Sequence, residues 1–148
     1  MVERAELTVT EADLVEAGVR ASLLELAVCD DCSEKLRQAV SVLCDYVQAT
    51  HLVDPSAACH GSLPRAREAL SAELASVEQR RDTLVRGLPT TLATRLTVLR
   101  ERNVSPRICG VFQERCAACN AELPSVLADA LKEGRDDFCP SCKRVLLS

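Results

Sequence analysis

Aromatic residues are scarce in this chain, which has no tryptophan, one tyrosine and two phenylalanines among its 148 residues. Proteins that bind single-stranded nucleic acids stack bases on aromatic side chains, so this composition argues against that class of surface. Long apolar runs are also missing: no stretch reaches the roughly 18 residues of a transmembrane helix, and the N-terminus lacks the apolar run of a signal peptide. We therefore expect a cytoplasmic protein that does not bind membranes.

The signatures of an active site are missing as well. The chain has no glycine-rich phosphate loop, and its two histidines, His51 and His60, have no nearby serine or cysteine in a recognisable catalytic order. We therefore predict a non-enzymatic protein without catalytic residues.

Cysteine, by contrast, is abundant, and four of the nine cysteines form two C-x-x-C pairs near the C-terminus. The pairs are Cys116-Ala-Ala-Cys119 and Cys139-Pro-Ser-Cys142, with 19 residues between their inner members. This spacing is typical of a zinc ribbon, in which four thiolates complete the tetrahedron that Zn²⁺ prefers. We predict that these four cysteines bind one structural zinc ion. A free C-x-x-C redox couple is the less specific alternative.

The residues around the pairs predict the local fold. Asn120 follows the first pair, where the backbone often needs a left-handed conformation that asparagine tolerates, whereas Lys143 after the second pair fits less well. Pro124 and Gly134 bracket a predicted short helix over residues 125–133, because proline favours a helix start and glycine its end.

Two phenylalanines and a final apolar run complete the expected ribbon over residues 107–148. Phe112 and Phe138 each precede a cysteine pair, and we expect both rings to pack over the metal site. Residues 144–147 are expected to return as a strand against residues 108–115.

Helical spacing of apolar residues dominates the first part of the chain. Thr8 with Glu11, or Thr10 with Asp13, can cap a first helix that ends near Thr50.

A second helix is expected from about Pro64 to Gly87, after a turn over residues 51–61, and a third includes Leu92, Leu96 and Leu99. The predicted fold class is mainly α with a small β part. An antiparallel helical, coiled-coil hairpin with a short third helix occupies residues 1–106, and the C4 zinc ribbon follows.

Charge supports the antiparallel pairing. Residues 1–60 hold four Lys/Arg and eleven Asp/Glu, a net charge of −7, whereas residues 61–106 hold eight and five, a net charge of +3. Residues 107–148 hold six of each, so the chain sums to −4. An acidic first helix beside a basic second helix gains favourable cross-helix pairs.

The basic residues also provide the candidate contacts with a partner or with phosphates. These candidates are Arg80, Arg81, Arg86, Lys143 and Arg144. Nucleic-acid binding through them would depend on salt, but the acidic chain, with an isoelectric point near 5.2, favours intramolecular pairing.

A second metal site at the hairpin is an alternative use of the remaining cysteines. Cys29 and Cys32 lie one helical turn apart, and the other candidate ligands are Cys44, Cys59, His51 and His60. These partners have no regular spacing, and free cysteine is commonly a small buried apolar residue, so we favour core or surface thiols.

Three features together resemble a bacterial family of C4-type zinc-ribbon proteins with an N-terminal coiled-coil hairpin. They are the run over residues 80–89, Leu123-Pro124 after the first cysteine pair, and Cys139-Pro-Ser-Cys142 followed by a basic residue and aliphatics. The resemblance covers roughly the C-terminal half, and family members usually carry glycine where Lys143 stands. It implies a non-enzymatic interaction factor with a protein partner, such as a sigma factor or other transcription machinery, in transcription or flagellar gene control. Homodimers are compatible with it.

An RNA-polymerase-directed or nucleic-acid-binding regulator is the alternative function. A coiled coil joined to a four-cysteine module is also similar to the secondary-channel factors of the DnaK-suppressor type, which carry an acidic hairpin tip. The expected tip here has only Asp54, so this resemblance is the weaker one.

Overall fold

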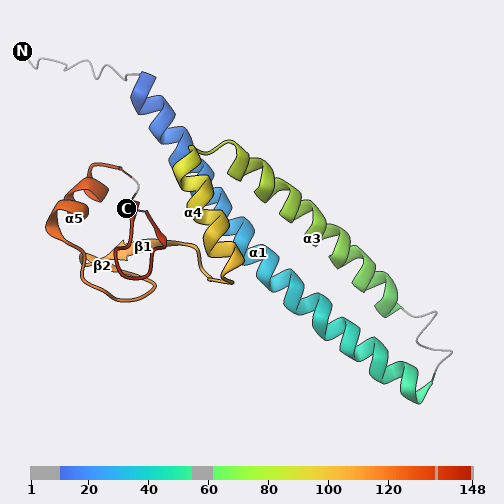
Figure 1. The fold of residues 1–148 in the computed structure, drawn as a ribbon. Helices are drawn as coiled ribbons and strands as arrows, with labels where there is room; N and C mark the ends of the chain where they lie inside the picture. Colours follow the sequence, from blue (N-terminus) through green and yellow to red (C-terminus); the bar gives the residue numbers. More distant parts are fainter. Residues whose placement is uncertain (1–10, 55–61, 136, 148) are drawn as a thin grey trace, which may run out of the picture. The chain divides into compact units, whose positions relative to one another are not determined.

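The computed structural model describes residues 11–54, 62–135 and 137–147, and the side chains from Val15 onward. It is mostly helical, with a small sheet near the C-terminus (Figure 1). This confirms the predicted fold class. Contacts divide the chain into two compact units: one contains Leu26–Gly87, and the other combines the residues up to Glu25 with Leu88–Ser148. The predicted domain boundary near residues 103–106 stays a prediction.

Helix α1 spans Glu11–Val53 and helix α3 spans Ser62–Arg86. The first of these units consists of helix α3 and the part of helix α1 that follows Glu25. Within the unit, Arg81 of α3 pairs with Asp30 of α1, whereas Glu78 pairs with Arg37, so residue numbers rise along one helix as they fall along the other. The helices are therefore antiparallel, as predicted.

The ends of these helices differ slightly from the predicted ones. Helix α1 continues three residues beyond Thr50, and α3 begins two residues before Pro64, which lies in its first turn, where proline is tolerated. The predicted caps at residues 8 and 10 lie outside the described residues.

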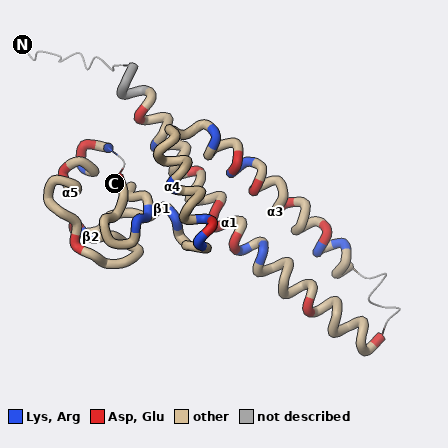
Figure 2. The backbone as a smooth tube through the Cα atoms, viewed as in Figure 1, with Lys and Arg blue, Asp and Glu red and all other residues tan. Residues whose placement is uncertain are grey.

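Charge is distributed less simply than the net values suggest. Figure 2 shows basic and acidic residues interspersed along α3. The Arg81–Asp30 pair has the predicted polarity, with the cation on the second helix, but the Arg37–Glu78 pair has the opposite polarity. Individual ion pairs, rather than two oppositely charged helices, connect α1 and α3.

Helix α4, Thr90–Glu101, belongs to the second unit. It starts after Pro89, which cannot continue α3, and it buries Leu92, Leu96 and Leu99. These leucines are spaced by four and three residues, so they form one apolar stripe, as the sequence predicted. Helix α4 contacts strand β4, Val145–Leu147.

The sheet has four short strands in the order β2-β1-β4-β3. Strand β1, Ile108–Phe112, pairs antiparallel with β2, Arg115–Cys116, and parallel with β4. Strand β3, Asp137–Phe138, pairs antiparallel with β4. All three β4 residues are buried, so this strand is the centre of the unit. The predicted return of the final apolar run against residues 108–115 is confirmed.

Helix α5, Ser125–Lys132, connects the two cysteine pairs. Pro124 precedes it, and Gly134 follows with φ +87°, a backbone conformation that favours glycine. Its buried face contains Ala128 and Leu131. The predicted helix is therefore confirmed, one residue shorter than expected.

The two phenylalanines behave differently from each other. Phe138 is half-buried and lies under the Arg95 guanidinium of α4, 5.0 Å from the ring centroid. Phe112 is 69% exposed, so the expectation that both rings pack over the cysteines is wrong for Phe112. It is the last residue of β1, where its side chain is left on the solvent side of the turn. Among the described residues, none of the helices combines the length and apolar character of a membrane span.

Candidate metal centre

The two C-x-x-C pairs adopt the same local conformation. In each, the residue after the second cysteine donates its backbone N–H to the carbonyl of the first: Asn120 to Cys116 at 2.8 Å, and Lys143 to Cys139 at 2.9 Å. Both donors have left-handed backbones, with φ 59° and 63°. The expectation for Asn120 is confirmed. Lys143 adopts the same conformation despite its side chain, whose Nζ donates to the Pro140 carbonyl at 2.6 Å.

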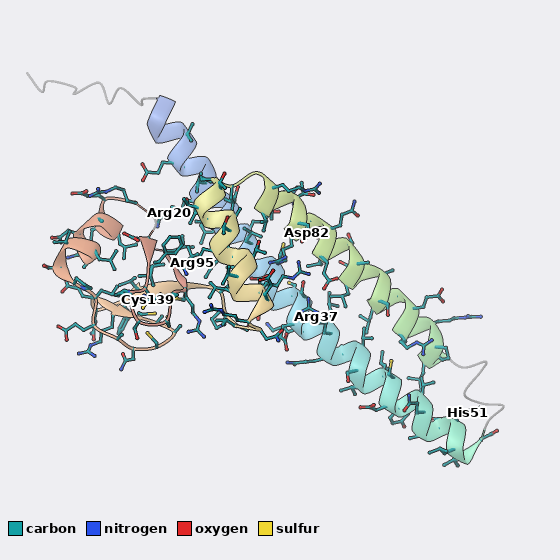
Figure 3. The ribbon with its side chains drawn as sticks, viewed as in Figure 1. Arg20, Arg37, His51, Asp82, Arg95 and Cys139 are labelled. Atoms are coloured by element: carbon teal, nitrogen blue, oxygen red, sulfur yellow. The ribbon has the colours of Figure 1, made fainter. Side chains whose placement is uncertain are left out.

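These turns bring four sulfur atoms together from two distant parts of the sequence. The Sγ atoms of Cys116, Cys119, Cys139 and Cys142 all lie within 4.8 Å of one another. Figure 3 labels one of these cysteines, Cys139, in the C-terminal unit. Cys119 lies 3.6 Å from Cys139, and Cys116 lies 3.7 Å from Cys142, so each contact joins one pair to the other.

The sulfur–sulfur distances match a tetrahedral metal site. Four thiolates at roughly 2.3 Å from a central zinc ion have tetrahedron edges of about 3.8 Å. The observed contacts of 3.6 and 3.7 Å are within 0.2 Å of this edge. These two of the six edges fit a tetrahedral site, and all four sulfurs lie close enough together to hold a metal ion.

Burial differs between the first and second cysteine of each pair. Cys116 and Cys139 are 1% and 0% exposed, whereas Cys119 and Cys142 lie closer to solvent. The surroundings are apolar, because the buried cluster around the sulfurs also contains Leu123, Leu131 and Leu146. An apolar surrounding limits water at the metal, as structural sites require.

Burial also sets the electrostatics of the thiols. It raises the pKa of Cys116 and that of Cys139 to about 11. Burial alone would raise the pKa of Cys142 too, but hydrogen bonds from the backbone N–H and the guanidinium of Arg144 outweigh it, and the pKa falls to about 6. One corner of the centre is therefore stabilised as a thiolate before any metal binds.

Arg144 is thus a candidate for stabilising the cysteine centre. The sequence had indicated a different role, a contact with a partner or with phosphates. Its guanidinium hydrogen-bonds Cys142, and its Nε donates to the Pro106 carbonyl at 2.7 Å. Four thiolates around Zn²⁺ carry a net charge of −2, so an adjacent cation stabilises the loaded centre. The spacing of basic residues does not reveal this role, because it depends on the pairing of β1 with β4.

The other candidate contact residues are divided between the two units, with the arginines of α3 in one and Lys143 in the other. Arg81 is 5% exposed and pairs with Asp30, which removes it from the accessible surface. Arg86 is exposed and donates to the Asp82 carbonyl. Arg80 is also exposed on α3, and Lys143 is exposed in the C-terminal unit.

The alternative metal site at the hairpin finds no support in the described part of the chain. The four-cysteine group is the only cluster of metal-ligating side chains among the residues described there. Cys29 is buried, Cys32 and Cys44 are half-buried, and His51 is exposed in the last turn of α1. Residues 59 and 60, the remaining candidates, lie outside the described residues.

Comparison with protein-family models, with curated proteins and with solved structures finds no match to this chain. The resemblance to C4-type zinc-ribbon proteins therefore stays a prediction from sequence motifs. The candidate metal site therefore rests on the positions of its four cysteine sulfurs.

Proposed function

We propose that this protein is a non-enzymatic interaction module whose C-terminal unit is stabilised by one structural zinc ion. The observation that carries the proposal is the convergence of four sulfurs, from two like turns, within 4.8 Å of one another. Tetrahedral all-thiolate sites bind zinc or iron, and closed four-cysteine sites of this kind are commonly structural zinc sites.

A structural metal fits the small cluster around the sulfurs. This cluster has five buried members, Cys116, Leu123, Leu131, Cys139 and Leu146, and two of them are themselves cysteines of the site, so it offers little apolar surface to hold the two turns together. Zinc binding worth about 10 kcal/mol or more supplies the missing folding energy. The metal then acts on structure, and the function resides in the surface that the structure presents.

A protein is the partner class that this surface favours. Phe112 and Val126 are 69% and 81% exposed in the C-terminal unit, and aromatic side chains such as Phe112 are enriched in protein interfaces. The resemblance described above points to a partner in transcription or flagellar gene control. Nucleic-acid binding is the weaker candidate, because Arg81 is buried in an ion pair and the chain is acidic.

The metal is tested first, by its stoichiometry. Protein purified without chelators should contain one zinc per chain, and Cys139→Ser should lose it, because Cys139 is a fully buried corner of the centre. The matched control is Cys44→Ser, which changes a half-buried cysteine of the hairpin. Iron in place of zinc, or unchanged zinc in Cys139→Ser, would contradict the proposal.

The partner is tested by affinity capture with the zinc-loaded protein as bait, from lysates with and without nuclease treatment. We expect a defined protein that survives nuclease and is not captured by Cys139→Ser or by Phe112→Ser. Retention of RNA or DNA, with loss of the proteins after nuclease treatment, would replace the protein-partner proposal by the nucleic-acid one.

A further inference from the structure

A fifth cysteine lies next to the four-cysteine centre. The Sγ of Cys109, in strand β1, is 3.7 Å from the Sγ of Cys116. Cys109 belongs to neither C-x-x-C pair, and it is not one of the four residues whose sulfurs all lie within 4.8 Å of one another. It is half-buried and packs against the buried cluster that contains Cys116 and Cys139.

The backbone on both sides holds this cysteine in place. Cys109 is paired with Leu146 in the parallel β1–β4 ladder, and the Ala117 N–H donates to the carbonyl of neighbouring Gly110 at 3.0 Å. The backbone N–H of Ala118 hydrogen-bonds both the Cys109 sulfur and the Cys116 sulfur. The two thiols therefore share one donor of the first cysteine turn.

We propose that Cys109 is a reserve ligand of the metal centre, able to take the corner that Cys116 occupies. The alternative ligand set is Cys109, Cys119, Cys139 and Cys142. This inference rests on the proposed function, because it requires that the centre binds a metal.

The geometry places the reserve sulfur one tetrahedron edge away from the corner it would fill. The 3.7 Å separation of the two sulfurs is close to the edge of about 3.8 Å in a four-thiolate zinc site. A change of the Cys109 χ1 rotamer moves its sulfur by about 3 Å, so the exchange needs only a small movement of the strand.

The exchange is balanced in bonds and charge. The bond between the metal and the Cys116 sulfur breaks, and a bond between the metal and the Cys109 sulfur forms. The proton of the Cys109 thiol moves to the Cys116 sulfur across their contact. Four thiolates bind the metal before and after, so the net charge of the centre does not change.

In the described part of the chain, no sixth cysteine joins the group beside the second pair. The remaining described cysteines, Cys29, Cys32 and Cys44, lie on α1, and the four-cysteine group includes none of them. Cys139 is as buried as Cys116 and occupies the equivalent position in its own turn, which makes it a matched control. The proposal therefore predicts an asymmetry between two corners that are otherwise alike.

The experiment compares Cys116→Ala, Cys139→Ala, Cys109→Ala and the double variant Cys109→Ala/Cys116→Ala. Alanine is used because a serine oxygen could itself bind the metal. Cobalt replaces zinc as the probe, since the thiolate-to-cobalt charge-transfer absorption per bound ion reports the number of sulfur ligands. A competing chelator gives the affinity of each variant for zinc.

We expect four-sulfur spectra for the wild type, Cys109→Ala and Cys116→Ala, and zinc affinity in Cys116→Ala reduced by only about 10–100-fold. Cys139→Ala and the double variant should lose one sulfur and fall well below that affinity. A Cys116→Ala protein that matches the double variant would overturn the inference, and so would a Cys109→Ala protein that loses a sulfur. A wild type without a four-sulfur spectrum would instead refute the proposed function.

Cys139→Ala controls for unfolding, because it removes a thiol as buried as that of Cys116. A second readout is cysteine alkylation of the zinc-loaded proteins. Cys109 should be modified in the wild type and protected in Cys116→Ala. Equal modification of Cys109 in both proteins would also overturn the inference.

Discussion

Arg81 is the side chain whose loss should most weaken the helical hairpin. It is 5% exposed, its Nε lies 2.8 Å from Oδ1 of Asp30, and its Nη1 lies 3.1 Å from Asp82. Replacement of Arg81 by methionine keeps much of the aliphatic stem but removes the charge. The Asp30 carboxylate, with 11% of its side chain exposed, is then left without this cation.

Burial of the ion pair, rather than the distance between its atoms, sets the expected loss in the free energy of unfolding. At 2.8 Å, the attraction is about 6 kcal/mol for an effective dielectric constant near 20, but the desolvation of both groups cancels most of it. Loss of only one partner of such a pair costs about 3–5 kcal/mol, since a charge stays buried. The Arg37–Glu78 pair is shorter, at 2.6 Å, but its side chains are 42% and 33% exposed. Its loss should cost about 0.2–1 kcal/mol.

Urea unfolding of the zinc-loaded protein, followed by far-UV circular dichroism, tests this reasoning. We expect Arg81→Met to lower the free energy of unfolding by about 3–5 kcal/mol and Arg37→Met by about 1 kcal/mol or less. The double variant Arg81→Met/Asp30→Leu should recover most of the loss, because no charge remains buried. Equal effects of the two single variants would refute the role of burial. A double variant as unstable as Arg81→Met would show that the cost comes from packing.

Two further predictions concern the C-terminal unit. Gly134→Ala should destabilise this unit by about 1–2 kcal/mol in thermal unfolding, because alanine is strained at φ +87°. The new methyl group has no atom within 4 Å, so a clash would not contribute. The control Gly110→Ala, which also has open space, should be nearly neutral. Arg144→Gln should raise the pH at which zinc is released, because Arg144 lowers the pKa of Cys142 and its loss lets protons compete at higher pH. We expect Arg144→Gln to lower the affinity for zinc about 10–100-fold. Because four protons replace the zinc ion, this loss shifts the pH midpoint of zinc release by about 0.25–0.5 pH unit. The control Arg135→Gln should leave this midpoint unchanged.

The parts of the C-terminal unit that could be predicted are those fixed by local chemistry. The C-x-x-C spacing requires a tight turn, and the structure has one at each pair, with left-handed residues at Asn120 and Lys143. Pro124 favours the start of α5 and Gly134 its end, and each effect depends only on the backbone conformation of that one residue. The convergence of the four sulfurs then follows from the pairing of two like turns, which the sequence spacing also indicated.

The turn between β1 and β2 shows why other parts could not be predicted. Gln113 and Glu114 both have positive φ, 49° and 59°, as in the two-residue hairpin turns that usually contain Asn-Gly. Neither residue carries that signal. Contacts from elsewhere support the turn: the Lys132 Nζ donates to the Glu114 carboxylate at 2.9 Å, and the Leu123 N–H donates to the Glu114 carbonyl. This tertiary turn brings Cys109 beside Cys116, so the fifth thiol was not recognisable from spacing.

The same distinction applies to the arginines of α3. Charge pattern predicted that they pair with the first helix, and Arg81 does, but its burial depends on which face of α1 it meets. In the sequence, Arg81 interrupts an apolar series of a/d-like spacing that consists of Leu70, Leu74, Val77, Leu84 and Leu88. In the structure it occupies that interior position and meets Asp30 there, so the apolar series and the ion pair share one face of the hairpin.

The proposed metal site and the buried cluster around it share residues in the C-terminal unit. Two of the five residues in its buried cluster, Cys116 and Cys139, are also proposed ligands, and each is at most 1% exposed. Without a metal, the low exposure raises the pKa of both thiols, so neutral thiols must fill the space where thiolates would bind. A zinc ion bound as proposed would supply both the positive charge that thiolates require and the bonds that complete this cluster. Chelation should therefore unfold the two cysteine turns rather than only empty the site.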